Sequence, residues 1–143
     1  MKNKLGENLL FGIWGIATIA TAGSLYFSEV LKYTPCTLCW YQRIFMYPIA
    51  LIMTIGLLNK RVQPIQIIVL AVLGWGVAAY HYSIQLIPTI GANSFCSSGS
   101  CTGRYIDWYG FVTIPFMALT AFTLILIGCF SYIKKIKGDK NYA

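Results

Sequence analysis

The chain has 143 residues, of which 57% are hydrophobic and only 10% are charged, and its formal net charge is +7. A soluble domain contains about 45–50% apolar and about 25% charged residues, so this composition excludes a soluble enzyme, a disordered chain and an ordinary nucleic-acid-binding protein. We expect an integral membrane protein.

Four apolar runs follow one another along the chain, and each has the roughly 17–25 residues that a helix needs to cross a bilayer. They extend over about 9–27, 40–58, 65–87 and 111–133. Asn59-Lys60-Arg61 closes the second run, Pro64 opens the third and Pro88 ends it. The sequence therefore predicts one all-α domain, residues 1–143, that forms a four-helix bundle in a membrane.

The first run also resembles a secretory signal peptide, because Lys2 and Lys4 precede it and Ala20-Thr21-Ala22 resembles a cleavage site. Apolar residues continue without a break to Phe27, which favours a membrane-spanning helix. In either case, the segment after this run lies on the same side of the membrane.

The basic residues are distributed unevenly between the predicted loops. Lys32, Arg43 and Arg104 fall on one side, and the other eight of the 11 fall on the opposite side: Lys2, Lys4, Lys60, Arg61, Lys134, Lys135, Lys137 and Lys140. Since basic loops stay in the cytoplasm, we expect both termini to be cytoplasmic and the loops at about 28–39 and 88–110 to lie outside the plasma membrane. Topology and contact with anionic lipid then explain the net charge, and no nucleic-acid partner is expected.

Four of the five cysteines fall in the two predicted outer loops. Cys36 and Cys39 form a C-x-x-C motif, and four residues separate Cys96 from Cys101. Cys129 lies within the last apolar run, where we expect it to be a packing residue. Disulfides persist outside the cell, whereas the cytosol reduces them. Two cysteine pairs on that side indicate thiol chemistry.

The first pair has a setting that is typical of reactive thiols. Thr34 and Pro35 resemble a helix start, with Thr as the cap and Pro in the first turn, which places Cys36 and Cys39 in the opening turn. The free N–H groups of a helix N-terminus favour a thiolate, and Arg43 adds a positive charge one turn deeper. These features favour redox chemistry. An inert disulfide, a zinc site and, for Arg43, simple contact with lipid phosphates stay open.

His81, the single histidine, lies within the third run, and Gln85 follows it by four residues on the same helix face. Polar side chains within hydrocarbon need partners. Two interpretations stay open. The pair forms hydrogen bonds to a neighbouring helix, or it lines an outward-facing cavity near Arg43 and Cys39.

The order of these motifs resembles the disulfide bond formation protein B (DsbB) family, and most of all its short Bacillus-type thiol-disulfide oxidoreductase C (BdbC-like) members. The matching segments are Pro35–Arg43 (PCTLCWYQR), His81 with Gln85, the Cys96/Cys101 pair, and Asp107–Phe111 (DWYGF) with Pro115. They occur in the family's order over about residues 10–133.

This resemblance implies a quinone-dependent protein-disulfide oxidoreductase that supports disulfide bond formation in exported proteins. Electrons would pass from an extracytoplasmic thioredoxin-like thiol oxidase (DsbA/BdbD-like) to Cys96–Cys101, then to Cys36–Cys39, and finally to a membrane quinone. An exposed loop rich in Ser and Gly suits exchange with a soluble protein, which is consistent with the role implied for Cys96 and Cys101.

The resemblance also implies that Cys39 faces the quinone, expected to be menaquinone, and that Arg43, His81 and Gln85 bind it. Arg43 would stabilise negative charge on the quinone oxygens at the membrane edge, where water is scarce. We expect no metal at the site and a monomer.

The second loop departs from the better-known family members, because only four residues separate Cys96 from Cys101 and leave no room for an interfacial helix. Whether Cys101 exchanges with Cys36 to form an interloop disulfide stays open.

Three other functions also stay open. They are a vitamin K epoxide reductase-like enzyme, whose C-x-x-C would be expected on the fourth span, a membrane protein whose four thiols hold zinc or copper, and a partner-binding subunit with inert disulfides.

Overall fold

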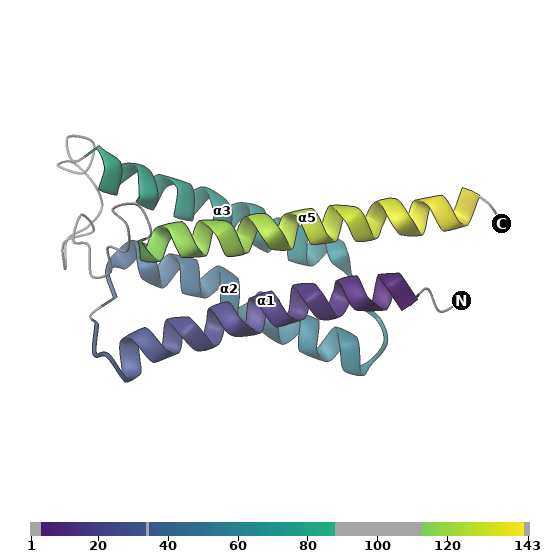
Figure 1. Cartoon of the computed structure of the whole chain (residues 1–143), viewed down its shortest axis with the longest axis horizontal. Coiled ribbons are helices and arrows are strands. Elements are labelled where there is room, and N and C mark those ends of the chain that lie inside the picture. Colours follow the sequence, from purple (N-terminus) through teal and green to yellow (C-terminus); the bar gives the residue numbers. More distant parts are fainter. Residues whose placement is uncertain (1–3, 34, 88–112, 142–143) are drawn as a thin grey trace.

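The computed structural model describes residues 4–33, 35–87 and 113–141, which form four helices and contain no strand. These are α1 (Lys4–Glu29), α2 (Thr37–Leu58), α3 (Pro64–Leu86) and α5 (Ile114–Asn141). Figure 1 shows the four helices side by side in one bundle. The prediction of an all-α, four-helix bundle is confirmed.

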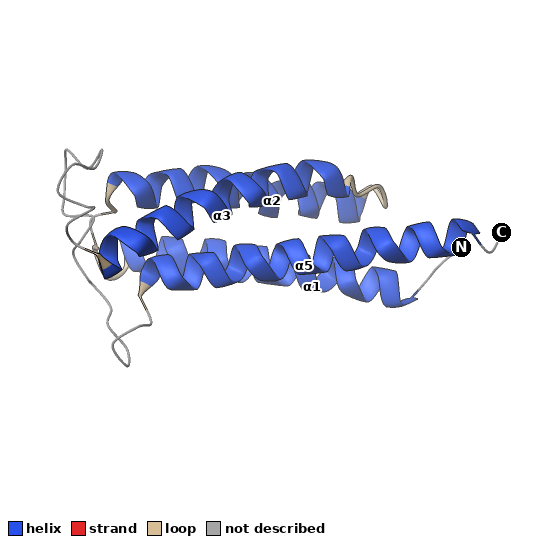
Figure 2. Cartoon of the chain, turned by 90° about the horizontal axis from the view of Figure 1, so that it is seen from above, coloured by secondary structure: helices blue, strands red, loops and turns tan. Residues whose placement is uncertain are grey.

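The helices form a square arrangement in which α1 and α3 each pack against both α2 and α5. As a result, α1 lies diagonally opposite α3, and α2 lies diagonally opposite α5. Both chain termini lie at one end of the bundle, together with the connection from α2 to α3, as Figures 1 and 2 show. The connection from α1 to α2 lies at the other end.

All four helices are long and apolar enough to cross a membrane. Large apolar side chains point outward along them, such as Ile19, Leu51 and Ile65, which are 74%, 62% and 71% exposed. Soluble monomers rarely expose contiguous apolar surface on this scale, whereas lipid chains would cover it in a bilayer. The fold is that of a multi-pass membrane protein.

The core between the helices is built from apolar residues of all four helices: Ile13, Ala17, Met46, Ile49, Met53, Ile67, Ala71, Ala78, Phe122, Ile125 and Cys129. Cys129 is therefore part of the core, as expected. The ring of Phe122 on α5 occupies the space where a Cβ at Gly74 of α3 would lie. Small residues at such points let membrane helices approach closely.

Only one of the two glycines that flank Trp75 lies in close contact with another helix. A Cβ at Gly76 would have no neighbour within 4 Å, in contrast to one at Gly74. Trp75 itself lies on the surface and donates a hydrogen bond from its indole nitrogen to Oγ1 of Thr123, at 3.1 Å. This bond joins α3 to α5.

Several helix ends differ from the predicted spans. α2 begins at Thr37, three residues before the expected start at 40, and α5 begins at Ile114 and continues to Asn141 instead of 133. The first outer loop is therefore shorter than the expected 28–39, because α1 continues to Glu29. Apolar runs mark the hydrocarbon-spanning part of a helix, and the helix can continue into polar surroundings beyond it. The second expected loop, 88–110, lies outside the described residues.

Candidate active site

The C-x-x-C motif lies where α2 begins. Cys36 is the N-cap residue, with φ −70° and ψ 168°, and its carbonyl oxygen accepts a hydrogen bond from the Trp40 N–H at 3.1 Å. The prediction that Pro35 lies in the first helical turn is wrong, since extended backbone continues through Cys36 and the helix begins at Thr37. An N-cap residue keeps such non-helical angles. Thr34, the predicted cap, lies outside the described residues.

The two thiols of this motif face each other, with Sγ of Cys36 and Sγ of Cys39 at 3.1 Å. Both are free cysteines. Cys36 is only 6% exposed, and Cys39 is half-buried. Thiols in contact at a helix mouth are placed for reversible disulfide formation. The second predicted pair, Cys96 and Cys101, lies outside the described residues.

Helix α3 supplies a buried histidine to this thiol pair. His81 is 1% exposed, and its Nε2 lies 3.6 Å from Sγ of Cys36. Its Nδ1 lies 3.2 Å from Nε2 of Gln42, which projects from α2. Leu38 and Ile84 pack around Cys36 and exclude water from it. The imidazole is thus held between a thiol and an amide in a largely apolar environment.

The contacts of Cys36 favour its thiolate. The pKa of the Cys36 thiol is lowered below its ordinary value, mainly because the thiol of Cys39 forms a hydrogen bond to it. Burial opposes this shift, and the hydrogen bond with His81 adds to it.

The two sulfur atoms of Cys36 and Cys39 and a ring nitrogen of His81 all lie within 4.8 Å of one another, so these three side chains could also hold a metal ion.

A cavity of about 580 Å³ lies between α1, α2 and α5, on the other side of Cys39. Its volume is within the roughly 300–1,000 Å³ of small-molecule sites. Helix α2 lines it with one continuous face, since the residues recur at helical spacing: Cys39, Gln42, Arg43, Met46 and Tyr47. The walls from α1 and α5 are predominantly apolar. The cavity therefore suits an apolar ligand with a few polar atoms.

Arg43 is fixed at the wall of this cavity. Its Nη2 donates a hydrogen bond to the carbonyl oxygen of Ser24 on α1, at 3.0 Å. Its guanidinium carbon lies 5.6 Å from the centroid of the Trp40 ring, within the range of a cation–π interaction. Arg43 is half-buried and lies one turn deeper than Cys39. A fixed positive charge and spare N–H donors are thus available beside a thiol.

Tyr47 adds a second polar group to the cavity wall. Its hydroxyl oxygen is buried and has no hydrogen-bond partner among the described residues. Most buried polar atoms are paired, so an orphan hydroxyl in a cavity wall is consistent with a ligand that supplies the missing partner. Neither Tyr47 nor Gln42 is among the site residues predicted from the sequence. Helical spacing from Cys39, at i+8 and i+3, would have indicated both.

The structure separates the expected quinone-binding residues into two groups. Arg43 lines the cavity, whereas neither His81 nor Gln85 is among the described residues that line it. His81 instead contacts Cys36 and Gln42. Gln85 is buried one turn further along α3. Of the two interpretations of His81, the contact with a neighbouring helix describes its position better.

Comparison with known proteins assigns the chain to a family. The sequence model of disulfide bond formation protein DsbB matches residues 7–132. The chain belongs to the DsbB family. A probable disulfide formation protein C of Halalkalibacterium halodurans is 50% identical over 127 residues, which cover 87% of this chain and 93% of that protein. The disulfide bond formation protein C of Bacillus subtilis is 44% identical over 144 aligned positions, covering 99% of each chain. No solved structure matches.

The family and the fold agree on a general function. This DsbB-family chain carries free thiols in a multi-pass helical bundle, which fits a membrane disulfide oxidoreductase. The match extends through α1, α2, α3 and most of α5. It favours disulfide chemistry over the vitamin K epoxide reductase-like alternative and over an inert structural role.

Proposed function

We propose that this protein reoxidises an extracytoplasmic thioredoxin-like thiol oxidase and passes the electrons to a membrane quinone. The observation that carries the proposal is the position of Cys39. Its sulfur contacts Cys36 at 3.1 Å, and its side chain also lines the cavity of about 580 Å³. One residue thus joins a dithiol to a site that can hold an apolar acceptor.

The two cysteines have different surroundings, which supports a direction of electron flow. Cys36 faces α3 through His81, while Cys39 faces the cavity between α1, α2 and α5. We propose that Cys36 exchanges with the second pair, Cys96 and Cys101, which follows α3 in the sequence and receives electrons from the thioredoxin-like partner. A thiolate of the second pair would attack Cys36, and the lowered pKa of Cys36 then makes it a good leaving group when that mixed disulfide is resolved.

The cavity residues fit a quinone. A quinone would accept the two electrons and two protons that are released when the Cys36–Cys39 dithiol becomes a disulfide. Arg43 and the orphan hydroxyl of Tyr47 would donate hydrogen bonds to its oxygens, and the apolar walls would contact its ring and tail. Menaquinone is the quinone we propose, from the resemblance to Bacillus-type members.

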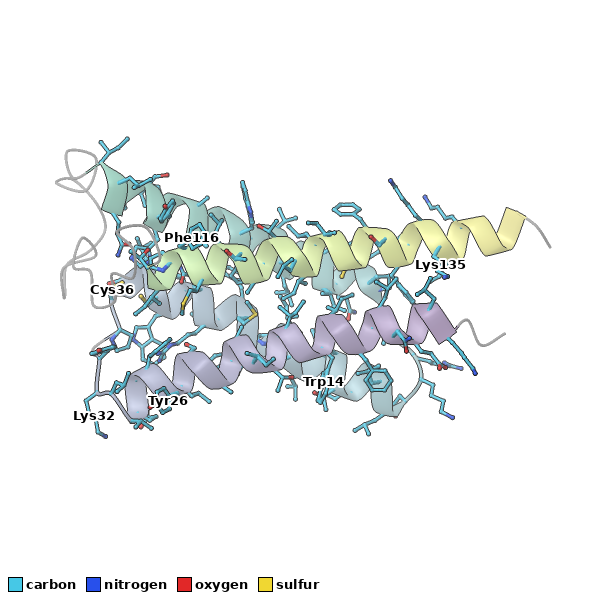
Figure 3. The ribbon with its side chains drawn as sticks, in the orientation of Figure 1. Trp14, Tyr26, Lys32, Cys36, Phe116 and Lys135 are labelled. Carbon is cyan, nitrogen blue, oxygen red and sulfur yellow. The ribbon has the colours of Figure 1, made fainter. Side chains whose placement is uncertain are left out.

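The ends of the bundle differ in charge, which supports an orientation in the cell membrane. The basic residues Lys4, Lys60, Arg61, Lys134, Lys135 and Lys137 belong to the segments near the termini and the α2–α3 connection. Figure 3 shows Cys36 and Lys135 toward opposite ends of the bundle. We propose that the basic end is cytoplasmic and that the thiols face outward. In intact cells, and with the five native cysteines replaced by serine, a membrane-impermeant maleimide should then label Lys32→Cys and not Lys60→Cys.

The function is tested by quinone reduction in detergent. The purified protein receives a reduced thioredoxin-like dithiol protein and oxidised quinone, and the quinone absorbance is followed. The oxidised-quinone signal should fall with the unmodified protein. It should also fall with the control variant Cys129→Ala, because Cys129 lies in the core between the helices. Cys39→Ser should abolish the fall and leave the partner trapped in a mixed disulfide with Cys96. Quinone reduction that persists in Cys39→Ser would contradict the proposed role of Cys39.

A further inference from the structure

We propose that the reduced active site is also a zinc site, in which Cys36, Cys39 and His81 bind one Zn²⁺. This goes beyond the proposed oxidase function, because binding needs only the dithiol and the histidine. It differs from the four-thiol metal site considered from the sequence, which requires Cys96 and Cys101. The metal implied here has two sulfur ligands and one nitrogen ligand.

The spacing of the three donors is close to that of a tetrahedral zinc site. Zn–S and Zn–N bonds of about 2.3 Å and 2.0–2.1 Å put the donors roughly 3.5–3.8 Å apart in a tetrahedron. Here Sγ of Cys36 lies 3.6 Å from Nε2 of His81 and 3.1 Å from Sγ of Cys39. All three donors lie within 4.8 Å of one another. Shifts of about 1 Å or less would complete three corners of the tetrahedron.

The charge balance suits a buried position. Cys36 and His81 are 6% and 1% exposed, and burial of a net charge in apolar surroundings is costly. Zn²⁺ with two thiolates and a neutral imidazole forms a group without net charge. The zinc ion therefore enters this apolar pocket without leaving an unpaired charge behind.

Gln42 completes the environment that zinc-bound histidines generally have. A histidine that binds zinc through one ring nitrogen usually donates the N–H of the other to a carbonyl or carboxylate oxygen, which fixes the ring. Nδ1 of His81 lies 3.2 Å from the Gln42 amide. Rotation of this amide by half a turn exchanges its nitrogen and oxygen, and Gln42 then accepts that hydrogen bond.

Zinc binding and disulfide formation exclude each other, because both use the same two sulfur atoms. Zinc would therefore hold the first cysteine pair in its reduced state without any change in oxidation number. If the proposed oxidase function is correct, micromolar zinc slows the reoxidation of the site, and a chelator restores it. The zinc site itself does not depend on that function.

Metal binding is the measurement that tests the site. The full-length reduced protein in detergent is titrated with Co²⁺, whose absorption reports thiolate ligands and tetrahedral geometry, and Zn²⁺ is added to displace it. We expect one ion per chain, retained in Cys129→Ala and in the double variant Cys96→Ser/Cys101→Ser. His81→Gln, which keeps a polar side chain next to Gln42, should weaken binding more than about tenfold, since even loss of an outer-shell partner costs about 10–100-fold.

Two results would overturn the zinc site. The first is an unchanged dissociation constant in His81→Gln, with helical content preserved by circular dichroism. The second is loss of binding in Cys96→Ser/Cys101→Ser, which would indicate the four-thiol site instead. If His81→Gln does not fold, the near-isosteric Cys36→Ser decides in its place, and unaltered thiolate–cobalt absorption in that variant would equally contradict the site.

Discussion

Nε2 of His81 on α3 lies 3.6 Å from Sγ of Cys36 at the mouth of α2, and His81 is not among the described residues that line the cavity beside Cys39. The C-x-x-C pair is therefore asymmetric. Cys36 has a histidine neighbour in apolar surroundings, and Cys39 has an arginine neighbour at a ligand-sized cavity. The side chain beside Cys36 is that of His81, and the side chain beside Cys39 is that of Arg43.

This asymmetry predicts the acidity of Cys36. Its pKa is lowered mainly by Cys39 and secondarily by His81, so the thiolate should be present at neutral pH, where an ordinary thiol with a pKa of about 8.5 is mostly protonated. Cys39→Ala should move the titration midpoint upward the most, and His81→Ala should move it upward by less. Thiolate ultraviolet absorbance, corrected with Cys36→Ser, measures the midpoint in the reduced protein. Equal titration midpoints in the unmodified protein, Cys39→Ala and His81→Ala would show that neither Cys39 nor His81 lowers the pKa of Cys36.

Arg43 should act mainly on the acceptor. In Arg43→Ala the cavity loses its positive charge and the bond to Ser24, so we expect the KM for quinone to rise roughly tenfold, which corresponds to about 1.4 kcal/mol. The matched control is Arg61→Ala, at the opposite end of the bundle. Steady-state quinone reduction with a saturating dithiol partner gives the KM. An unchanged KM would leave Arg43 with only a structural role between α1 and α2.

The bundle could be predicted from sequence because hydrocarbon imposes length and composition on a spanning helix. The helix start at Thr37 could not, since Pro35 and Thr34 form a plausible cap by residue type alone. The choice between caps depends on contacts across helices, here those of the Cys36 thiol with His81. Sequence spacing carries no such information.

The residue types that form the site could be predicted from the sequence more easily than the contacts between them. The position of Arg43 beside Cys39 follows from spacing within one helix, and both residues line the cavity. The neighbour of His81 depends on how α3 rotates against α2, which the apolar pattern of α3 leaves open because nearly every face is apolar. For the same reason the bridging position of Gln42 appears only in three dimensions.

Tyr47 provides a separate test of the cavity. In Tyr47→Phe the buried orphan hydroxyl is removed, so the free protein should be as stable as before or slightly more stable, since no hydrogen bond is lost. If a ligand oxygen accepts from this hydroxyl, the KM for quinone rises several-fold, by about 0.5–1.5 kcal/mol in binding. Tyr80→Phe, on the exposed face of α3, is the control. Equal KM values in both variants would exclude the Tyr47 hydroxyl from the ligand site.

The contact between Gly74 and Phe122 predicts a stability effect that is independent of the chemistry. In Gly74→Ala the new Cβ overlaps the Phe122 ring, so α3 and α5 must separate locally, at a cost of about 1–3 kcal/mol as in other overpacked cores. Gly76→Ala meets no neighbour and should be neutral or stabilising, because alanine favours the helix over glycine. Unfolding in detergent, followed by circular dichroism, compares the two. Phe122→Leu should partly rescue Gly74→Ala, since the shared contact makes the two changes non-additive. Additive losses would mean that the two residues are not in contact in the bilayer-like environment.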